Sequence, residues 1–280
     1  MTMAEGTEKI VVAKNCNREP GPGIQLRMNL TGNTILITGG GSGIGLALAA
    51  ELQKLGNQVV IAGRRKPALE AAAAAHPGLK WLQLNVEDAA AVKAFAASAV
   101  ADYPALNVLI NNAGIMRAEN YLAEPVDLSV AETEISTNLL GPVRLTAALL
   151  PHLRRQAHAA IMNVSSGLAF LPMALTPVYC ATKAALHSWT ESLRYQLRDT
   201  RVDVQELIPP YVATDLMDGR EDPLAMPLSD YIAEVMQILK DNPQAKEIAV
   251  ERVKPLRNAV ERGNYDKVFA GLNGSRPPRT

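Results

Sequence analysis

The sequence predicts an α/β fold, a doubly wound parallel sheet, because short apolar runs alternate with longer helical stretches. The runs are rich in β-branched residues and apolar along most of their length, which is typical of strands buried on both faces. These predicted strands cover residues 34–38, 58–62, 80–84, 107–111, 160–164 and 202–208. The helices predicted between them cover residues 43–55, 66–75, 88–101, 130–155 and 178–199. Helical connections of this length join strands that run parallel.

Length and composition indicate one globular domain. The chain has 280 residues, 48% of them hydrophobic, and its 28 basic side chains balance its 28 acidic ones. A balanced charge gives no reason to expect nucleic acid or a membrane surface as a partner, and no apolar run approaches the roughly 18 residues of a membrane-spanning helix. Because Cys16 and Cys180 are the only cysteines, we expect no disulfide framework and a cytoplasmic location.

Both ends of the chain and the segment after Ile208 depart from the strand–helix alternation. Residues 1–28 are polar, contain a Pro/Gly cluster and lack the pattern of a secretory signal, so we expect a flexible arm. Residues 209–240 hold several prolines and a predicted helix over 229–240, and we interpret them as a substrate lid. A short strand is predicted over 247–250. The single domain is expected to cover residues 29–270, followed by a frayed tail over 271–280.

The stretch TGGGSGIG at residues 38–45 lies between the first strand and the first helix. Glycines let the backbone approach a ligand closely, and a helix N-terminus offers N–H groups to an anion. The spacing fits G-x-x-x-G-x-G and does not fit G-x-G-x-x-G, whose third glycine position is Leu46. A dinucleotide site is predicted here, the alternative being a simple connecting turn. The candidate residues are Gly39, Gly41, Ser42, Gly43, Ile44 and Gly45.

Arg64 and Arg65 follow the second strand, where an acidic residue would bind the ribose 2′-hydroxyl of NAD. Guanidinium groups suit the 2′-phosphate of NADP, so we expect NADP(H) to be preferred and NAD(H) to be possible. The alternative is that both arginines belong to a solvated turn. Further cofactor candidates follow the third and fourth strands, and these are Asn85, Val86, Asn112, Ala113 and Gly114.

Tyr179 and Lys183 are four positions apart in a predicted helix and therefore share one face. The pair alone is common by chance, but Asn138 and Ser166 are predicted to lie at the same edge of the sheet, where ligands of open α/β sheets bind. An adjacent ammonium group, together with the positive nicotinamide of an oxidised cofactor, favours the phenolate form of a tyrosine. Lowering the pKa by about 3 units requires roughly 4 kcal/mol. Tyr179 is therefore a candidate general acid and base.

In their order and spacing these motifs resemble those of the short-chain dehydrogenase/reductases, in the compact branch of the family. IPPYVATDL (208–216) and ERVKPLRNA (251–259) resemble the DltE-like oxidoreductases within it. The resemblance covers about residues 29–215 and implies a Rossmann-type fold without a metal. It implies an NADP(H)-dependent oxidoreductase that interconverts a carbonyl and a secondary alcohol, in a homodimer or homotetramer. The implied catalytic residues are Asn138, Ser166, Tyr179 and Lys183, of which Tyr179 and Lys183 also contact the cofactor.

The chain departs from the family after its sixth strand, where Pro210 stands in place of a usual glycine. Pro209, Val212 and Thr214 are the cofactor candidates of this loop by resemblance. The apolar composition of the lid predicts a mostly apolar small-molecule carbonyl or alcohol as substrate, although the same side chains would also pack a lid. The alternative from another functional class is a non-catalytic NADP(H)-binding sensor or scaffold. Such a protein needs the glycine loop but has no use for Tyr179 and Lys183.

Overall fold

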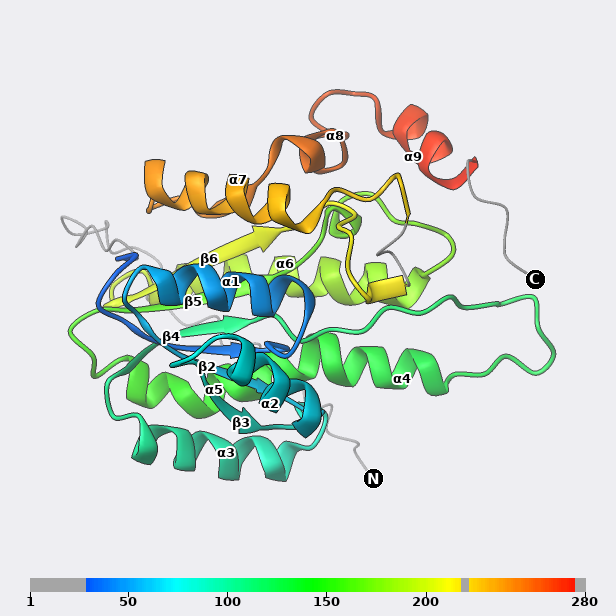
Figure 1. The fold of residues 1–280 in the computed structure, drawn as a ribbon. Coiled ribbons are helices and arrows are strands. Elements are labelled where there is room, and N and C mark those ends of the chain that lie inside the picture. The colour runs from blue at the N-terminus through cyan, green and yellow to red at the C-terminus, as the bar shows by residue number, and fades with distance from the viewer. Residues whose placement is uncertain (1–28, 218–221, 275–280) are drawn as a thin grey trace, which may run out of the picture.

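A computed structural model of the protein describes residues 29–217 and 222–274. These residues fold around one seven-stranded sheet (Figure 1). The strand order is β3-β2-β1-β4-β5-β6-β7, and every neighbouring pair is parallel. The strands are β1 Thr34–Thr38, β2 Gln58–Gly63, β3 Lys80–Gln83, β4 Leu106–Asn111, β5 Ala159–Val164, β6 Val202–Ile208 and β7 Glu247–Ala249. The strand order reverses between β1 and β4, which confirms the predicted doubly wound sheet.

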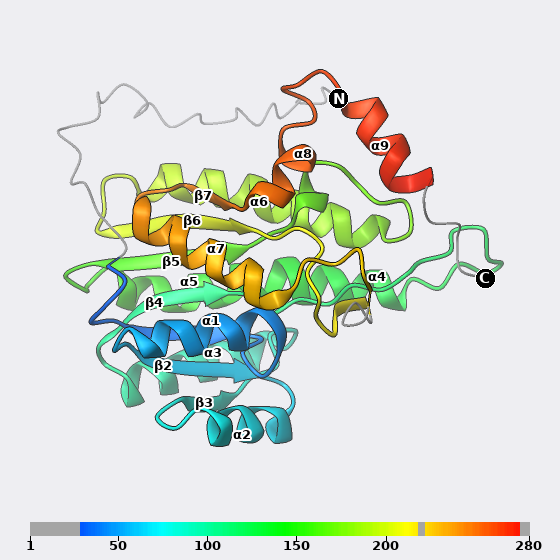
Figure 2. The ribbon, with the colours of Figure 1, turned by 45° about the horizontal axis from the view of Figure 1, so that its top comes forward.

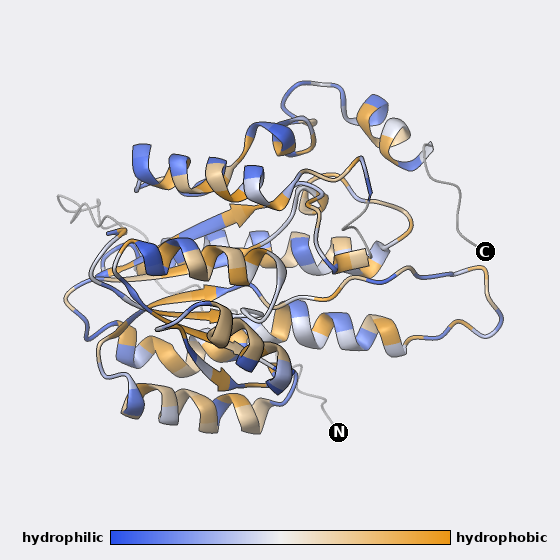
Figure 3. Cartoon of the chain, in the orientation of Figure 1, coloured by the Kyte–Doolittle hydropathy of each residue, from blue (hydrophilic) through white to orange (hydrophobic). Residues whose placement is uncertain are grey.

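Helices cover both faces of the sheet (Figure 2). One face packs against α1 Gly43–Lys54, α2 Lys66–Ala75 and α7 Leu228–Asp241, and the other against α3 Ala89–Asp102, α5 Gly141–Leu153 and α6 Pro177–Leu197. Successive residues of a strand point to opposite faces, so Ile35 and Ile37 enter one core cluster and Leu36 enters the other. This explains the apolar central strands, which are largely orange in Figure 3.

The predicted helix over 130–155 is three consecutive elements in the structure. These are α4 Ser129–Ile135, a π-helical turn η1 at Ser136–Leu140, and α5. A π-helical turn holds one extra residue per turn and often marks a functional site. The apolar spacing of the sequence does not reveal that extra residue, so the prediction of one regular helix was wrong. The wider turn contains Asn138.

The predicted lid is shorter than expected. Helix α7 belongs to the core, since Tyr231 and Val235 are fully buried in it. The irregular part ends at residue 227, where Val212 forms a parallel bridge with Met226. Its residues 218–221 lie outside the described part of the chain.

The C-terminal segment contains structure that the sequence pattern did not predict. After β7 come a 3-10 turn η4 at Glu251–Val253, α8 Lys254–Arg257 and α9 Tyr265–Gly274. Helix α9 corrects the first part of the predicted frayed tail, because residues 271–274 are helical, and the domain therefore continues past residue 270. Residues 275–280 and the predicted arm over 1–28 lie outside the described residues.

Candidate active site

The glycine turn after β1 is held against the end of β4 by side-chain hydrogen bonds. The Thr38 hydroxyl accepts the N–H groups of Asn112 and Ala113, both at 3.0 Å. The Asn112 amide donates to the carbonyl oxygens of Thr38 at 2.9 Å and Gly39 at 3.3 Å. Two of the predicted cofactor segments are therefore joined at the point where the strand order reverses, which is where open α/β sheets bind ligands.

Gly39 and Gly45 show the two different reasons why this turn needs glycine. Gly39 has a φ of 67°, in the left-handed region that favours glycine. A Cβ at Gly45 would lie 2.5 Å from Asn112 Nδ2 and from the Gly39 carbonyl oxygen, so no side chain fits there. Ser42 precedes α1 without capping it through its side chain. The first turn of α1 thus offers backbone N–H groups that fit the pyrophosphate of a dinucleotide.

The other candidates of the glycine loop pack around it. A Cβ at Gly43 would lie 3.5 Å from Thr214, and one at Gly41 would lie 3.4 Å from Ala68 of α2. Ile44 packs against the hydrophobic core. The predicted Thr214 is thus brought to the glycine loop by the irregular segment after β6.

Arg64 and Arg65 have different partners, which the sequence did not reveal. Arg64 Nη1 forms an ion pair with Glu87 Oε1 at 2.5 Å, and the same oxygen accepts the Thr137 hydroxyl at 2.8 Å. Arg65 Nη2 lies 3.4 Å from Ser42 Oγ in the glycine loop. Arg64 is therefore engaged by a carboxylate, whereas Arg65 reaches the predicted phosphate-binding turn.

Asn85 and Val86 follow β3, as predicted. Asn85 Oδ1 accepts the backbone N–H of Glu87 at 3.2 Å, so its side chain shapes the turn. Val86 is buried, and a Cβ at Gly141 would lie 3.0 Å from it.

The four predicted catalytic residues come together at the ends of β4 and β5. Lys183 Nζ donates to the Val164 carbonyl oxygen at 2.8 Å and lies 5.6 Å from the centre of the Tyr179 ring. A Cβ at Gly114 would lie 3.4 Å from Asn138 Oδ1 and 3.6 Å from Lys183 Nζ. Ser166 follows β5 and precedes the 3-10 turn η2 at Gly167–Ala169, where its hydroxyl accepts the Leu168 N–H.

Asn138 in the π-helical turn is fully buried and completely hydrogen bonded. Its Oδ1 accepts the Ile115 N–H at 2.9 Å, while its Nδ2 donates to the Ile115 carbonyl at 2.8 Å and to Thr182 Oγ1 at 3.2 Å. The side chain thus connects the segment after β4 with helix α6, which carries Tyr179 and Lys183.

The expected acidification of Tyr179 depends on Lys183 together with the positive nicotinamide of an oxidised cofactor. Tyr179 is 5% exposed, and burial raises its pKa above the ordinary value of 10, while the neighbouring Ser166 hydroxyl acts in the opposite direction. Burial also lowers the pKa of Lys183 to about 8, opposed by the charges of Glu206 and Glu134. The predicted acidification is therefore not a property of the Tyr179–Lys183 pair by itself, because desolvation of the phenolate outweighs it.

Pro209 and Val212 lie on the other side of the site. The Pro209 carbonyl accepts the Gly167 N–H at 2.9 Å, which places it next to Ser166. Val212 is buried in the core cluster. Its neighbours Tyr211 and Ala213 make the two backbone hydrogen bonds to Met226.

A polar cluster behind the site was missed by the sequence analysis. His187 Nδ1 lies 2.8 Å from Glu206 Oε2, and the hydrogen bond with Glu206 is the main cause of a raised pKa of His187. One ring nitrogen of His187 and one carboxylate oxygen each of Glu206 and Glu247, atoms that could bind a metal ion, lie within 4.8 Å of one another. Arg257 binds both oxygens of Glu247, at 2.8 and 3.0 Å, so a network of ion pairs accounts for this cluster.

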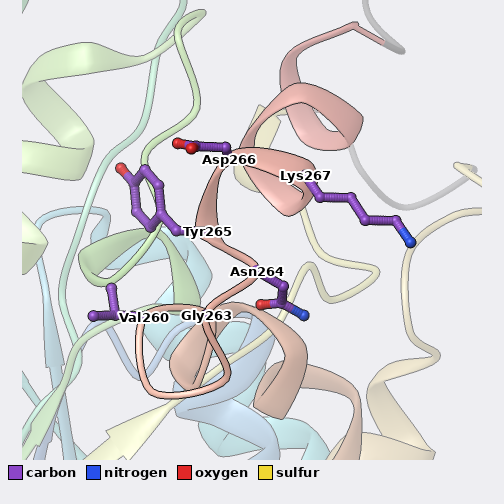
Figure 4. Close-up of a pocket in the computed structure, with 6 residues that line it drawn as sticks. All are labelled: Val260, Gly263, Asn264, Tyr265, Asp266 and Lys267. Atoms are coloured by element: carbon purple, nitrogen blue, oxygen red, sulfur yellow. The ribbon is translucent and has the colours of Figure 1, made fainter.

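Two cavities lie near the C-terminal helix. One of about 300 Å³ opens between α9, the loop after β4 and the loop after β5, and it is lined by Glu119, Asn120, Tyr121, Leu122, Met173, Ala174, Leu175, Leu272 and Asn273. The other, of about 510 Å³, is lined by Val260 and residues 263–267, where Tyr265 and Lys267 point in opposite directions (Figure 4). None of the predicted site residues lines either cavity.

Helix α9 is fixed to the loop after β5 by Asn273. Its Oδ1 accepts the Ala174 N–H at 2.6 Å, and its Nδ2 donates to the Pro172 carbonyl at 3.2 Å. Leu272 packs against the cluster of Met173, Tyr179 and Cys180. A helix 86 or more residues beyond Tyr179 in the chain thus forms a wall beside it.

No helix in the described residues is long and apolar enough to cross a membrane. The cytoplasmic location expected from composition stays a prediction.

Comparison with known proteins agrees with this geometry. An uncharacterized oxidoreductase DltE of Bacillus subtilis (strain 168) is 44% identical over 251 residues, which are 88% of this chain and 98% of the relative. An NADP-dependent 3-hydroxy acid dehydrogenase of Schizosaccharomyces pombe is 34% identical over 66% of this chain and 74% of its own.

Solved structures share the fold. A serine dehydrogenase complexed with NADP+ has a TM-score of 0.67 at 28% identity, covering 73% of this chain and 88% of its own. A short chain dehydrogenase from Burkholderia cenocepacia J2315 in complex with NADP has a TM-score of 0.73 at 24% identity, covering 88% of this chain and 99% of its own. The short chain dehydrogenase family itself matches residues 33–224. With the parallel sheet, the glycine turn and the four converging side chains, this match shows that the chain belongs to the short-chain dehydrogenases, an oxidoreductase family.

Proposed function

We propose that the protein is an NADP(H)-dependent oxidoreductase that interconverts a carbonyl and a secondary alcohol, with Tyr179 as general acid and base. The observation that carries this proposal is the convergence of Asn138, Ser166, Tyr179 and Lys183 at the ends of β4 and β5, next to the reversal point of the sheet. A protein that only binds the dinucleotide has no use for this arrangement.

The bound dinucleotide supplies the hydride in the reductive direction and accepts it in the oxidative one. Tyr179 donates its phenolic proton to the substrate oxygen during reduction, and the Ser166 hydroxyl donates a hydrogen bond to the same oxygen as charge develops there. Because burial keeps Tyr179 protonated, it is an acid with a proton available at neutral pH. Lys183, with a pKa of about 8, is largely cationic at pH 7 and stabilises the phenolate that proton donation leaves.

Arg65 supports the preference for NADP(H). Its guanidinium lies 3.4 Å from the Ser42 hydroxyl, so a 2′-phosphate near the glycine loop would meet a cation and a hydroxyl together. Arg64 is already paired with Glu87. We therefore assign the 2′-phosphate contact to Arg65, with NAD(H) as a weaker cofactor.

The cavity of about 300 Å³ supports a medium-sized, mostly apolar substrate. Tyr179 has apolar neighbours beside its polar ones, because Met173, Leu175 and Leu272 belong to its hydrophobic cluster. Apolar surfaces of this kind bind hydrocarbon groups without recognising charge, so we place the part of the substrate distal to the carbonyl between the loop after β5 and α9.

Exposed apolar side chains support a homodimer or homotetramer. Ile135 is 41% exposed, Leu140 37% and Tyr195 59%, on the consecutive elements α4 and η1 and on α6. Burial of such side chains between copies would stabilise association. We expect light scattering at micromolar concentration to give two or four times the 30.0 kDa mass of one chain, and a single-chain mass would contradict the oligomer.

Replacing Tyr179 by Phe tests the reaction. We expect Tyr179→Phe to lower kcat for NADPH-dependent reduction of ketones by about 10²- to 10⁴-fold, because it removes the proton donor. Absorbance at 340 nm with a panel of apolar and charged ketones, aldehydes and quinones measures the loss. Tyr195→Phe on the exposed side of α6 is the matched control and should retain activity. Tight NADPH binding without turnover of any carbonyl would favour the sensor instead.

Replacing the two arginines separately tests the cofactor preference. We expect Arg65→Ala to raise the Kd for NADPH about tenfold, the loss of one charged hydrogen bond, and to leave the Kd for NADH unchanged. Arg64→Ala should have the smaller effect, since Arg64 is paired with Glu87. Fluorescence titration gives all four constants. Equal weakening of NADPH and NADH by Arg65→Ala would contradict the assignment.

Enlarging Leu272 tests the substrate cavity. Because Leu272→Trp fills space beside Tyr179, we expect the KM for a long-chain apolar ketone to rise about tenfold, while a small ketone is reduced at nearly the wild-type rate. Val260→Trp, in the other cavity of Figure 4, is the control and should change neither. An identical response of long and short ketones would argue against α9 as the wall of the substrate site.

A further inference from the structure

Glu134 is a buried acid that the reaction scheme above does not use. It lies in α4, four residues before Asn138, and is 0% exposed. Its Oε1 accepts the backbone N–H of Arg117 at 2.8 Å. Its Oε2 is buried and has no hydrogen-bond partner among the residues that the structure describes. A fully buried carboxyl oxygen without a partner is costly, so its retention beside the site requires a reason.

Glu134 and Asn138 hold the same backbone segment. Asn138 binds the N–H and carbonyl of Ile115, and Glu134 binds the N–H of Arg117 two residues later. Residues four apart on a helix share one face, and residues two apart in an extended segment point the same way. The segment that passes Gly114, next to Lys183, is therefore fixed by both side chains together.

Charged and titratable groups face Glu134 from two elements. Arg117 and Glu119 come from the segment after β4, while Tyr179, Cys180 and Lys183 come from α6. Burial raises the pKa of Glu134 to about 7, opposed by the Arg117 N–H and by the charges of Arg117 and Lys183. The ionised Glu134 in turn raises the pKa of both Tyr179 and Lys183.

We propose that Glu134 is a positioning residue for the proton-transfer step, whose hydrogen bond fixes the segment beside Tyr179 and Lys183 and whose buried, unpartnered oxygen places a carboxylate next to that pair. This inference rests on the proposed reductase function. Glu134 touches no reacting atom, so no bond is made or broken at its carboxyl. Tyr179 donates the proton, and Glu134 determines the pH range over which that proton is present.

The pH profile of Glu134→Gln separates this role from a purely structural one. Reduction needs protonated Tyr179 and Lys183, so its rate falls at alkaline pH. The negative charge of the wild-type carboxylate shifts that fall in rate to higher pH, whereas the neutral amide of Glu134→Gln does not. We compare the ratio of kcat/KM of wild type to kcat/KM of Glu134→Gln. Below about pH 6, where Glu134 is protonated, we expect this ratio to be constant. By about pH 9 we expect it to rise about three- to tenfold. A ratio that stays constant over the whole range would overturn the proposal.

Two further variants control for position and folding. Glu132→Gln lies on the same helix at an exposed position and should reproduce the wild-type profile. Glu134→Asp keeps the charge but shortens the side chain, so it should restore the wild-type alkaline limb even with a lower overall rate. If Glu134→Asp loses the alkaline limb as Glu134→Gln does, the charge has no role and the inference fails. This comparison also remains available if Glu134→Gln does not fold.

A measurement without turnover separates failure of this inference from failure of the proposed function. The pKa of Lys183, followed by ¹³C NMR of labelled lysines and assigned with Lys183→Arg, should be lower in Glu134→Gln than in wild type. An unchanged pKa would refute the coupling in a protein of any activity. If the coupling is present but wild type reduces no carbonyl, the proposed reductase function is what fails.

Discussion

The hydrogen bonds between Thr38 and the start of the segment after β4 are the constraint on which the rest of the site depends. β1 and β4 pair in parallel at the reversal of the strand order, with Ile37 opposite Ile110. The Thr38 hydroxyl and the Asn112 amide then tie the two strand ends together. The glycine turn leaves this junction in one direction and the segment bound by Asn138 leaves it in the other. A shift of the junction would therefore separate the dinucleotide loop from the catalytic residues.

A chain of hydrogen bonds between buried amide and hydroxyl side chains stabilises the strands at that junction. Asn111 donates to Thr146 of α5 at 3.1 Å and to Asn163 of β5 at 2.8 Å, and Asn163 donates to Thr190 of α6 at 2.9 Å. Hydrogen bonds in such a low-dielectric interior strengthen one another, and of this chain only Asn111 Oδ1 has no partner in the described residues. The chain connects β4 and β5 with α5 and α6, so the elements next to Ser166 and Lys183 keep their relative positions.

The sequence contained most of the fold and pointed to the candidate site residues, because these follow from local patterns. β1 and the glycine turn are recognisable from residue types alone, and the strand ends place Ser166 and Tyr179 at one edge. The π-helical turn, the separate partners of Arg64 and Arg65, and the wall formed by α9 were not predictable in this way. Each depends on contacts between distant parts of the chain, as the bond from Ala174 to Asn273 shows across 99 residues. The raised pKa of Tyr179 likewise follows from its burial, which cannot be predicted from the spacing of residues in the sequence.

The charge on Lys183 links these features. Burial at 4% exposure lowers its pKa to about 8, and without compensation the ammonium would be a poor partner for a phenolate. Two buried acids on different elements oppose that effect, Glu206 on β6 and Glu134 on α4. Each acid has one buried oxygen without a hydrogen-bond partner in the described residues. The other oxygen of Glu206 is held by His187, one helical turn after Lys183, whereas the other oxygen of Glu134 accepts a backbone N–H. The two acids therefore differ in their partners. Glu206 is a fixed countercharge within an ion-pair network, and Glu134, with a pKa of about 7, is a countercharge that is present only above neutral pH.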